Sequence, residues 1–178
     1  LFTKAKEKGI HTCLDTSGIM FPKKHTGTDQ ISEREISLTG ISENMASDRM
    51  EKTEQLMSVT DLVMLDIKHI NDEEHQKLTG QSNSNILAFA KYLDSIGKPV
   101  WIRHVVVPGI TFDEKELTEL GLFLKTLHNV EKLEVLPYHS MGKVKYDNLG
   151  MDYVLKDTPQ LTKAEAKEAE RIIRAAME

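Results

Sequence analysis

Cysteine is almost absent from this sequence, which holds one, Cys13, in 178 residues. A single thiol excludes a disulfide within the chain, and it excludes an iron–sulfur or zinc centre held by several of the chain's own cysteines. The lack of disulfides is typical of proteins that stay in a reducing compartment, so we expect a cytoplasmic location.

Long apolar runs and blocks of basic residues are absent as well. No run approaches the roughly 18 residues of a membrane-spanning helix, and no secretory signal pattern opens the chain. The formal net charge is −5, which argues against general nucleic-acid binding because such binding depends on dense Lys and Arg. The chain begins at Leu1, inside what reads as a helix, and we therefore expect a piece of a longer protein.

The sequence does contain alternating helical and strand-like periods, over a length (residues 1–178) that suits a single domain. Strands are expected at residues 11–15, 63–67, 100–107 and 132–136. Helices are expected at residues 2–8, 71–78, 83–96, 113–128 and from 162 onwards. Capping residues support three of the helix starts: Asn71, Asp113 with Glu116, and Thr162 with Glu165. The alternation predicts an α/β fold with parallel strands, in either a doubly wound sheet or a barrel.

Residues 22–55 differ from the rest of the chain because few of them are apolar. A helix that starts near Ser42 would place Ala46, Met50, Thr53 and Met57 on one face. The preceding part, residues 22–41, is long for a loop inside a compact domain. We expect a flexible insertion there, with a lid over a binding site as the alternative.

Polar residues stand at the carboxyl end of each predicted strand, where α/β folds bind their ligands. They are Asp15 and Thr16, Asp66 and Lys68, Arg103 and His104, and Tyr138 and His139. In the run 63–68, aliphatic residues occupy one face, whereas Met64, Asp66 and Lys68 occupy the other. An isolated buried charge is costly, so these charges need partners, which are either one another in a structural salt bridge or a polar ligand.

Simpler explanations compete at several of these positions. Asp15 precedes Thr-Ser-Gly and is either a turn former or a site residue, and His139 is either a loop histidine or a site residue. His104 faces away from Arg103 and is expected to be a packing histidine, while Cys13 is expected to be a small apolar residue of its strand. The remaining histidines show no metal-ligand spacing.

Five stretches of the sequence resemble one enzyme family. They are GIHTCLDTSG (9–18), DLVMLDIKH (61–69), LTGQSNSNILAFAKYL (78–93), VWIRHVVVPG (100–109) and EVLPYHSMGKVKY (134–146). In this order they are similar to the later part of the pyruvate formate-lyase activating enzymes, which are radical S-adenosylmethionine enzymes that act on a glycyl radical enzyme. The resemblance covers nearly the whole chain except about residues 22–55.

The resemblance implies a partial (β/α)6 barrel with outer helices, of which this chain would carry the last four parallel strands. Members of the family hold a [4Fe–4S] cluster with a CxxxCxxC motif near the N-terminus, and they bind the amino group of S-adenosylmethionine near a Gly-Gly-Glu stretch. Neither motif occurs here, so both would lie before Leu1. We therefore expect the cluster only in the full-length protein, and no radical initiation by this chain alone.

By the same resemblance, four residues would surround a monovalent cation: Asp15, Thr16, Met64 through its backbone, and Asp66. Carboxylate and carbonyl oxygens suit such a hard cation.

Five residues would contact S-adenosylmethionine or lie beside it: Asp15, Asp66, Lys68, Arg103 and His139. Lys68 offers a point charge to an anionic group, and Arg103 lies toward the cofactor or the substrate peptide. Because the cluster cysteines are missing, no residue of this chain is expected to be catalytic.

The implied reaction is the reductive cleavage of S-adenosylmethionine, after which the 5′-deoxyadenosyl radical takes a hydrogen from a glycine of the partner. The implied partners are pyruvate formate-lyase and a one-electron reductant such as flavodoxin, with no nucleic acid and no membrane. The alternatives are an activase for another glycyl radical enzyme, such as a dehydratase, a cluster-less binding module without catalysis, and an unrelated α/β enzyme. An exposed sheet edge also predicts self-association around residues 11–15.

Overall fold

The computed structural model describes residues 1–22 and 43–178. Its strands form one parallel sheet, with the four strands in chain order from edge to edge. They are β1 (Cys13–Thr16), β2 (Leu62–Asp66), β3 (Val100–Val106) and β4 (Val130–Pro137). The four predicted strands are therefore confirmed, with ends displaced by one or two residues.

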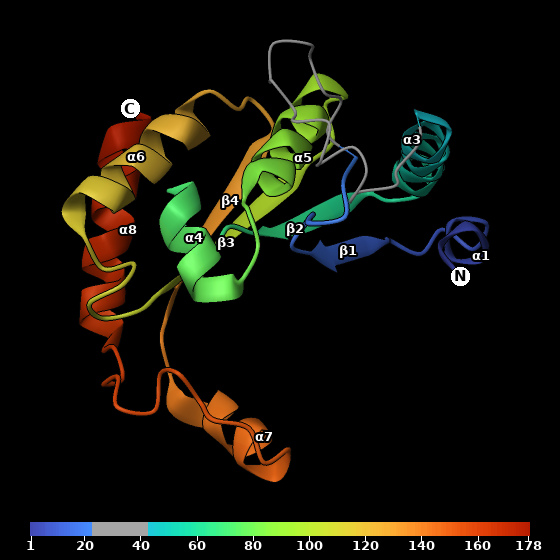
Figure 1. Ribbon diagram of the computed structural model, residues 1–178. Helices are drawn as coiled ribbons and strands as arrows, with labels where there is room; N and C mark the ends of the chain where they lie inside the picture. The colour runs from blue at the N-terminus through green and yellow to red at the C-terminus, as the bar shows by residue number, and fades with distance from the viewer. Residues whose placement is uncertain (23–42) are drawn as a thin grey trace.

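The strand order decides between the two predicted architectures. Each crossover moves to the next strand in the same direction, and crossovers between parallel strands are right-handed. The connecting helices then all fall on one face, as in a barrel, whereas a doubly wound sheet reverses direction and has helices on both faces. Figure 1 shows the curved sheet with α5, α6 and α8 along its outer side. The fold is a partial (β/α) barrel.

Helices appear where the periodicity predicted them, and the structure adds α7, the short η1 turn and a defined start for α3. They are α1 (Phe2–Lys6), α3 (Glu43–Ser58), α4 (Asp72–Thr79), α5 (Ser84–Ser95), α6 (Glu114–Lys125), η1 (Ser140–Gly142), α7 (Lys143–Asn148) and α8 (Lys163–Met177). Asn71 accepts a hydrogen bond from the backbone N–H of Glu74 at 3.2 Å and caps α4. Thr162 and Glu165 form the reciprocal capping box of α8.

The hydrophobic core lies between the outer face of the sheet and its covering helices. The sheet contributes fully buried aliphatic residues, among them Val63, Leu65, Val100, Ile102 and Val106. The helices contribute Phe89 and Leu93 from α5, Leu117, Leu120 and Leu124 from α6, and Ala169 and Ile173 from α8. One face of every central strand packs into this core. The alternate side chains therefore point to the opposite, inner face of the sheet.

Helices α6 and α8 pack closely because one position carries no side chain. A Cβ atom on Gly121 would lie 2.4 Å from the carbonyl oxygen of Ile173 and 2.6 Å from the Cβ atom of Ala176. Glycine therefore allows the two backbones to approach each other at this point.

The predicted insertion at residues 22–41 falls, apart from Pro22, outside the described residues. The helix predicted after it is confirmed as α3, where Met57 is buried and Met50 and Thr53 are partly buried. The side chain of Ala46 is not among those that the structure describes. Over residues 1–22 and 43–178, no helix combines the length and the apolar character needed to span a membrane.

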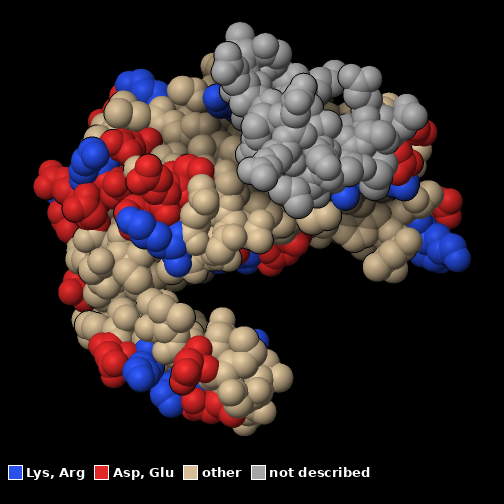
Figure 2. All heavy atoms as spheres, viewed as in Figure 1, with Lys and Arg blue, Asp and Glu red and all other residues tan. Residues whose placement is uncertain are grey.

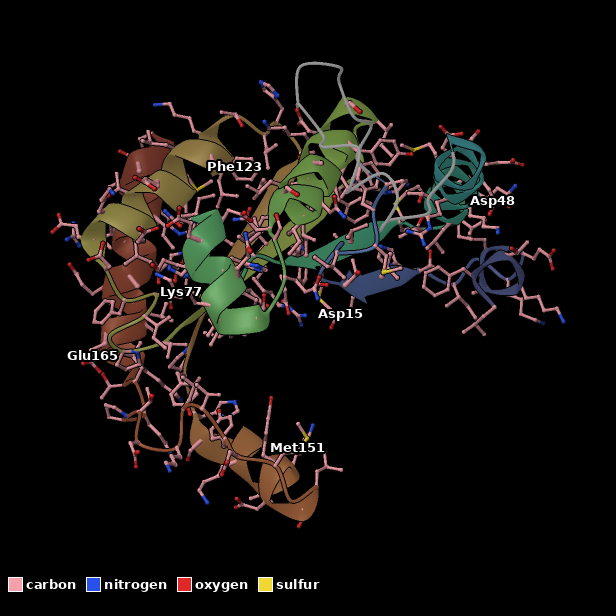
Figure 3. The ribbon with its side chains drawn as sticks, in the orientation of Figure 1. Asp15, Asp48, Lys77, Phe123, Met151 and Glu165 are labelled. Atoms are coloured by element: carbon pink, nitrogen blue, oxygen red, sulfur yellow. The ribbon has the colours of Figure 1, made fainter. Side chains whose placement is uncertain are left out.

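An arm formed by residues 139–160 leaves the carboxyl end of β4 and carries η1 and α7 (Figure 1). It is tied to the residue that precedes it by a 3.0 Å hydrogen bond between the hydroxyl groups of Tyr138 and Tyr153. Figure 2 shows a recess between this arm and the rest of the molecule. In the same orientation, Figure 3 places Asp15 on one side of the recess and Met151 on the other.

Candidate functional site

The inner face of the sheet carries the charged residues that the sequence singled out. Asp66, Lys68 and Arg103 are partly exposed on this face, and Asp15 is more exposed at the edge strand. Parallel register explains their proximity, since Asp15 lies beside Met64, and Asp66 lies beside Arg103. Strand alternation and register together place the four side chains on one surface.

An ion-pair network joins these four residues. Arg103 donates from Nε to Oδ1 of Asp66 at 2.8 Å, and its second guanidinium nitrogen donates to Asp15. Lys68 donates to the other oxygen of Asp66, also at 2.8 Å. Both oxygens of Asp66 therefore have cationic partners, which compensates the cost of placing a carboxylate in a partly desolvated position.

The network keeps Arg103 charged. Burial alone would lower the pKa of Arg103, but Asp66 and Asp15 more than offset this effect, so the pKa is raised above its ordinary value. Lys68 is the more accessible cation, with 37% of its side chain exposed against 20% for Arg103. An anionic group that approaches from the recess would therefore meet Lys68 more readily than Arg103.

Two further ionisable residues extend this surface onto β4, and the sequence analysis missed them. Lys132 and Glu134 form an ion pair, and the Lys132 ammonium lies 4.4 Å from the ring centroid of Trp101. In the sheet, Glu134 lies beside Arg103. The alternation of charged and apolar residues in β4 is the signal that would have revealed them.

The four residues predicted to surround a cation are only partly brought together. Asp15 and Asp66 converge, but the group between them is the guanidinium of Arg103. The Thr16 hydroxyl accepts a hydrogen bond from the backbone N–H of Gly18 at 3.0 Å and so serves the turn after β1. Among the described residues, no group of three or more His, Cys, Asp or Glu side chains is arranged to hold a metal ion. The carboxylates suit a monovalent cation chemically, and the cation site stays a prediction.

His139 lies apart from the network. It is exposed and is the N-cap residue of η1, directly after Tyr138 at the base of the arm. No hydrogen bond or ion pair of the described residues joins it to the other four predicted contact residues. The structure thus assembles Asp15, Asp66, Lys68 and Arg103, while His139 stands at the base of the arm.

Buried polar residues lie on the opposite, helix-covered side of the sheet from the network. Of these, the sequence predicted only that His104 is a packing histidine. His104 is 3% exposed, and its Nδ1 atom donates to the carbonyl of Ile67 at 2.8 Å. Burial lowers the pKa of His104 to about 4, and this hydrogen bond offsets only part of the effect. His104 is therefore neutral near pH 7, with its proton on Nδ1.

Glu116 corrects one expectation about α6. Asp113 does cap this helix, because its side chain accepts from the backbone N–H groups of Lys115 and Glu116. The Glu116 side chain does not complete a capping box. It turns inward instead, and its Oε2 atom lies 3.7 Å from Nδ1 of His69. That nitrogen already accepts a hydrogen bond from the backbone N–H of Asn71 at 3.1 Å, and Oε2 of Glu116 has no hydrogen-bond partner among the described residues.

A separate hollow of about 160 Å³ lies on the outer side of β1, between α3 and α5. Its lining includes Leu14, Phe21, Met57 and Phe89, and no ionisable side chain of the described residues reaches it. It lacks the polar groups that catalysis requires, so the inner-face network is the better candidate site.

Comparison with models of known protein families gives no match. Single proteins do match. The chain is 45% identical over 176 residues to the pyruvate formate-lyase-activating enzyme of Streptococcus mutans serotype c, which covers 97% of this chain and 57% of that protein. It is 40% identical over 173 residues to the enzyme of the same name from Staphylococcus epidermidis, which covers 97% of this chain and 60% of that protein.

A solved structure supports the architecture. A domain of pyruvate-formate lyase-activating enzyme from Bacteroides vulgatus superposes with a TM-score of 0.67 at 18% identity, over 98% of this chain and 82% of that one. At this identity the likeness shows the fold alone. The chain spans between half and two thirds of the length of the curated relatives it matches. Over nearly all of its own length, this chain is homologous to the pyruvate formate-lyase-activating enzymes.

Proposed function

We propose that this chain forms the later part of an enzyme that generates a glycyl radical on pyruvate formate-lyase, and that its inner-face network binds S-adenosylmethionine. The observation that carries the proposal is the meeting of Asp15, Asp66, Lys68 and Arg103 on the open inner face of a partial barrel. The homologous proteins are named for pyruvate formate-lyase, which supports this partner over another glycyl radical enzyme.

The residue types fit the polar groups of S-adenosylmethionine. The ligand carries a carboxylate, an ammonium group and ribose hydroxyls. Lys68 and Arg103 supply cationic donors for the carboxylate, whereas Asp15 and Asp66 supply acceptors for the ammonium group or the hydroxyls. His139 at the base of the arm would complete the set. The protein's task is to bind and orient the ligand and to exclude water, since the radical chemistry belongs to the cofactors.

A [4Fe–4S] cluster does not fit the residues of this chain. Such a cluster needs several thiolates, and the sequence has only Cys13, which is exposed on the edge strand β1. We therefore assign no step of the reaction to a cluster held by this chain. A one-electron reductant such as flavodoxin and a cytoplasmic location remain parts of the proposal that follow from the resemblance and from the cysteine content.

Binding of S-adenosylmethionine tests the proposal directly. We expect weak binding by the chain in isothermal titration calorimetry, and about a tenfold loss of affinity in Lys68→Met because a hydrogen bond to a charged group is removed. Lys91→Met is the matched control, since Lys91 is exposed on α5 away from the network. The absence of binding by the unaltered chain, or an equal loss in both variants, would refute the ligand assignment.

Incubation with S-adenosylmethionine and dithionite tests the expectation about radical initiation. Because one cysteine does not hold the cluster, we expect no 5′-deoxyadenosine from this chain by liquid chromatography. A full-length relative carrying the three-cysteine motif serves as the positive control. Formation of 5′-deoxyadenosine by the chain itself would overturn the expectation.

A further inference from the structure

We infer that His104 and Asn83 are positioning residues for Lys68: from the buried side of the sheet, they fix the backbone on both sides of this lysine and thereby aim its ammonium group at Asp66. The inference rests on the proposed function for its ligand, but its geometry concerns residues of the chain alone.

Lys68 lies just beyond the end of β2, where the sheet no longer holds the backbone completely. The backbone N–H of Ile67 still donates to the carbonyl of Arg103 at 3.0 Å. The carbonyl of Ile67, however, accepts its hydrogen bond from the His104 side chain at 2.8 Å. Since this carbonyl belongs to the planar peptide unit that contains the Lys68 nitrogen, its direction fixes one side of Lys68.

Asn83 fixes the other side. Its amide nitrogen donates to the carbonyl oxygens of His69 at 3.1 Å and Ile70 at 2.6 Å. Asn83 is 3% exposed, and its backbone N–H donates to Asp72 at 2.7 Å. Asn83 stands at the N-cap position of α5 but makes no side-chain cap there. Its side chain binds the segment after β2 instead.

The chemistry of these contacts explains why the residue types matter. A carbonyl oxygen only accepts hydrogen bonds, so His104 must carry a proton on Nδ1 and Asn83 must present its amide nitrogen. Both residues make contacts that are buried or partly buried, so an unpaired carbonyl in that place would be unfavourable. The segment carrying Lys68 is thus held from behind while its side chain stays 37% exposed on the inner face.

His75 offers a matched control for His104. It is also buried, its Nδ1 atom lies 2.7 Å from the carbonyl of Gln81, and its Nε2 atom has no hydrogen-bond partner among the described residues, as is also true of His104. The Gln81 carbonyl lies outside the segment that carries Lys68. Asn85, which donates to the carbonyl of Ile19 at 3.1 Å, is the corresponding control for Asn83.

The first test measures the side-chain NMR signal of Lys68 in the chain without any ligand. The side-chain signal of Lys68 is assigned by its loss in Lys68→Met. The reference for an unpaired ammonium group is the signal of Lys125, which is exposed on α6 and has no hydrogen bond or ion pair among the described residues. We expect His104→Leu and Asn83→Asp to shift the Lys68 signal toward that reference. His104→Asn should preserve it, because an amide nitrogen can replace Nδ1 as the donor, and so should His75→Leu and Asn85→Asp.

The second test measures the affinity of the chain for S-adenosylmethionine and for 5′-methylthioadenosine, which lacks the amino-acid carboxylate. His104→Leu should weaken binding of the former by about tenfold, as Lys68→Met does, and leave the latter within about twofold; the double variant should add no further loss. A Lys68 signal unchanged in both His104→Leu and Asn83→Asp, or shifted equally by the control variants, overturns the inference. Failure of the unaltered chain to bind S-adenosylmethionine refutes only the ligand, because the NMR test is independent of it.

Discussion

Replacement of Gly121 by alanine is expected to lower the free energy of unfolding by about 2 kcal/mol, although alanine is the better helix former by about 1 kcal/mol. The added Cβ atom would lie 2.4 Å from the carbonyl oxygen of Ile173 and 2.6 Å from the Cβ atom of Ala176. The first of these neighbours is backbone, which does not move aside as the end of a flexible side chain does. Helices α6 and α8 must therefore separate.

Urea denaturation followed by circular dichroism measures this effect. Leu122→Ala is the control, because Leu122 is the next residue of α6 and is 53% exposed; its change should stay within about 0.5 kcal/mol. The midpoint of Gly121→Ala should fall while the slope with denaturant concentration stays the same. A Gly121→Ala protein as stable as the unaltered chain would contradict the close approach of α6 and α8.

Acidification from pH 7 to pH 4 is expected to reduce the free energy of unfolding by about 3 kcal/mol through His104 alone. Burial lowers the pKa of His104 to about 4, from an ordinary value of 6.5. Between these two values the unfolded chain binds the proton and the folded chain does not, so protonation favours unfolding. The loss begins near pH 6.5 and is complete near pH 4.

The surroundings of His104 support this direction. The charged or titratable groups near it are Lys68 and His69 on the segment after β2, and Glu116 on α6. Lys68 and His69 both disfavour a second positive charge. Glu116 lies nearest to His69, with its Oε2 atom 3.7 Å from Nδ1, and no ion pair of the described residues joins it to His104.

Unfolding curves at several pH values test the prediction. His104→Leu should remove most of the slope between pH 6.5 and pH 4, whereas His11→Gln, a change at an exposed histidine, should leave it intact. Equal slopes in His104→Leu and the unaltered chain would show that His104 is not the group responsible.

Short-range patterns predicted much of this fold and site. The alternation in residues 63–68 placed Asp66 and Lys68 opposite the aliphatic face, and Asn71 capped α4 as expected. Of the two alternatives left open for Asp66 and Lys68, the structure shows the ion pair between them, and the ligand stays a prediction. These features depend on residues that are close in the chain, so the sequence alone contains the information.

One local expectation, the capping box of α6, was wrong, and one helix start lacks the side-chain cap that its residue type would allow. Glu116 was expected to complete the cap of α6 but lies beside His69. Asn83 does stand at the start of α5 as expected, but its side chain donates to the carbonyls of His69 and Ile70 instead of capping the helix. For Asn83, buried carbonyl acceptors that need a partner are favoured over a helix cap that water can replace. Glu116 makes no such gain, because its buried Oε2 atom has no hydrogen-bond partner among the described residues.

By itself the sequence determined the alternation of strands and helices, the face on which each charge lies, and the homology with the activating enzymes. Only the tertiary structure decided which charges meet. Arg103 joins Asp66, 37 positions away, and Asp15, 88 positions away. Periodicity and capping arise from neighbours within a few residues, whereas these ion pairs depend on the order and register of three strands. The strand order and register exist only once the core between the sheet and its helices has formed.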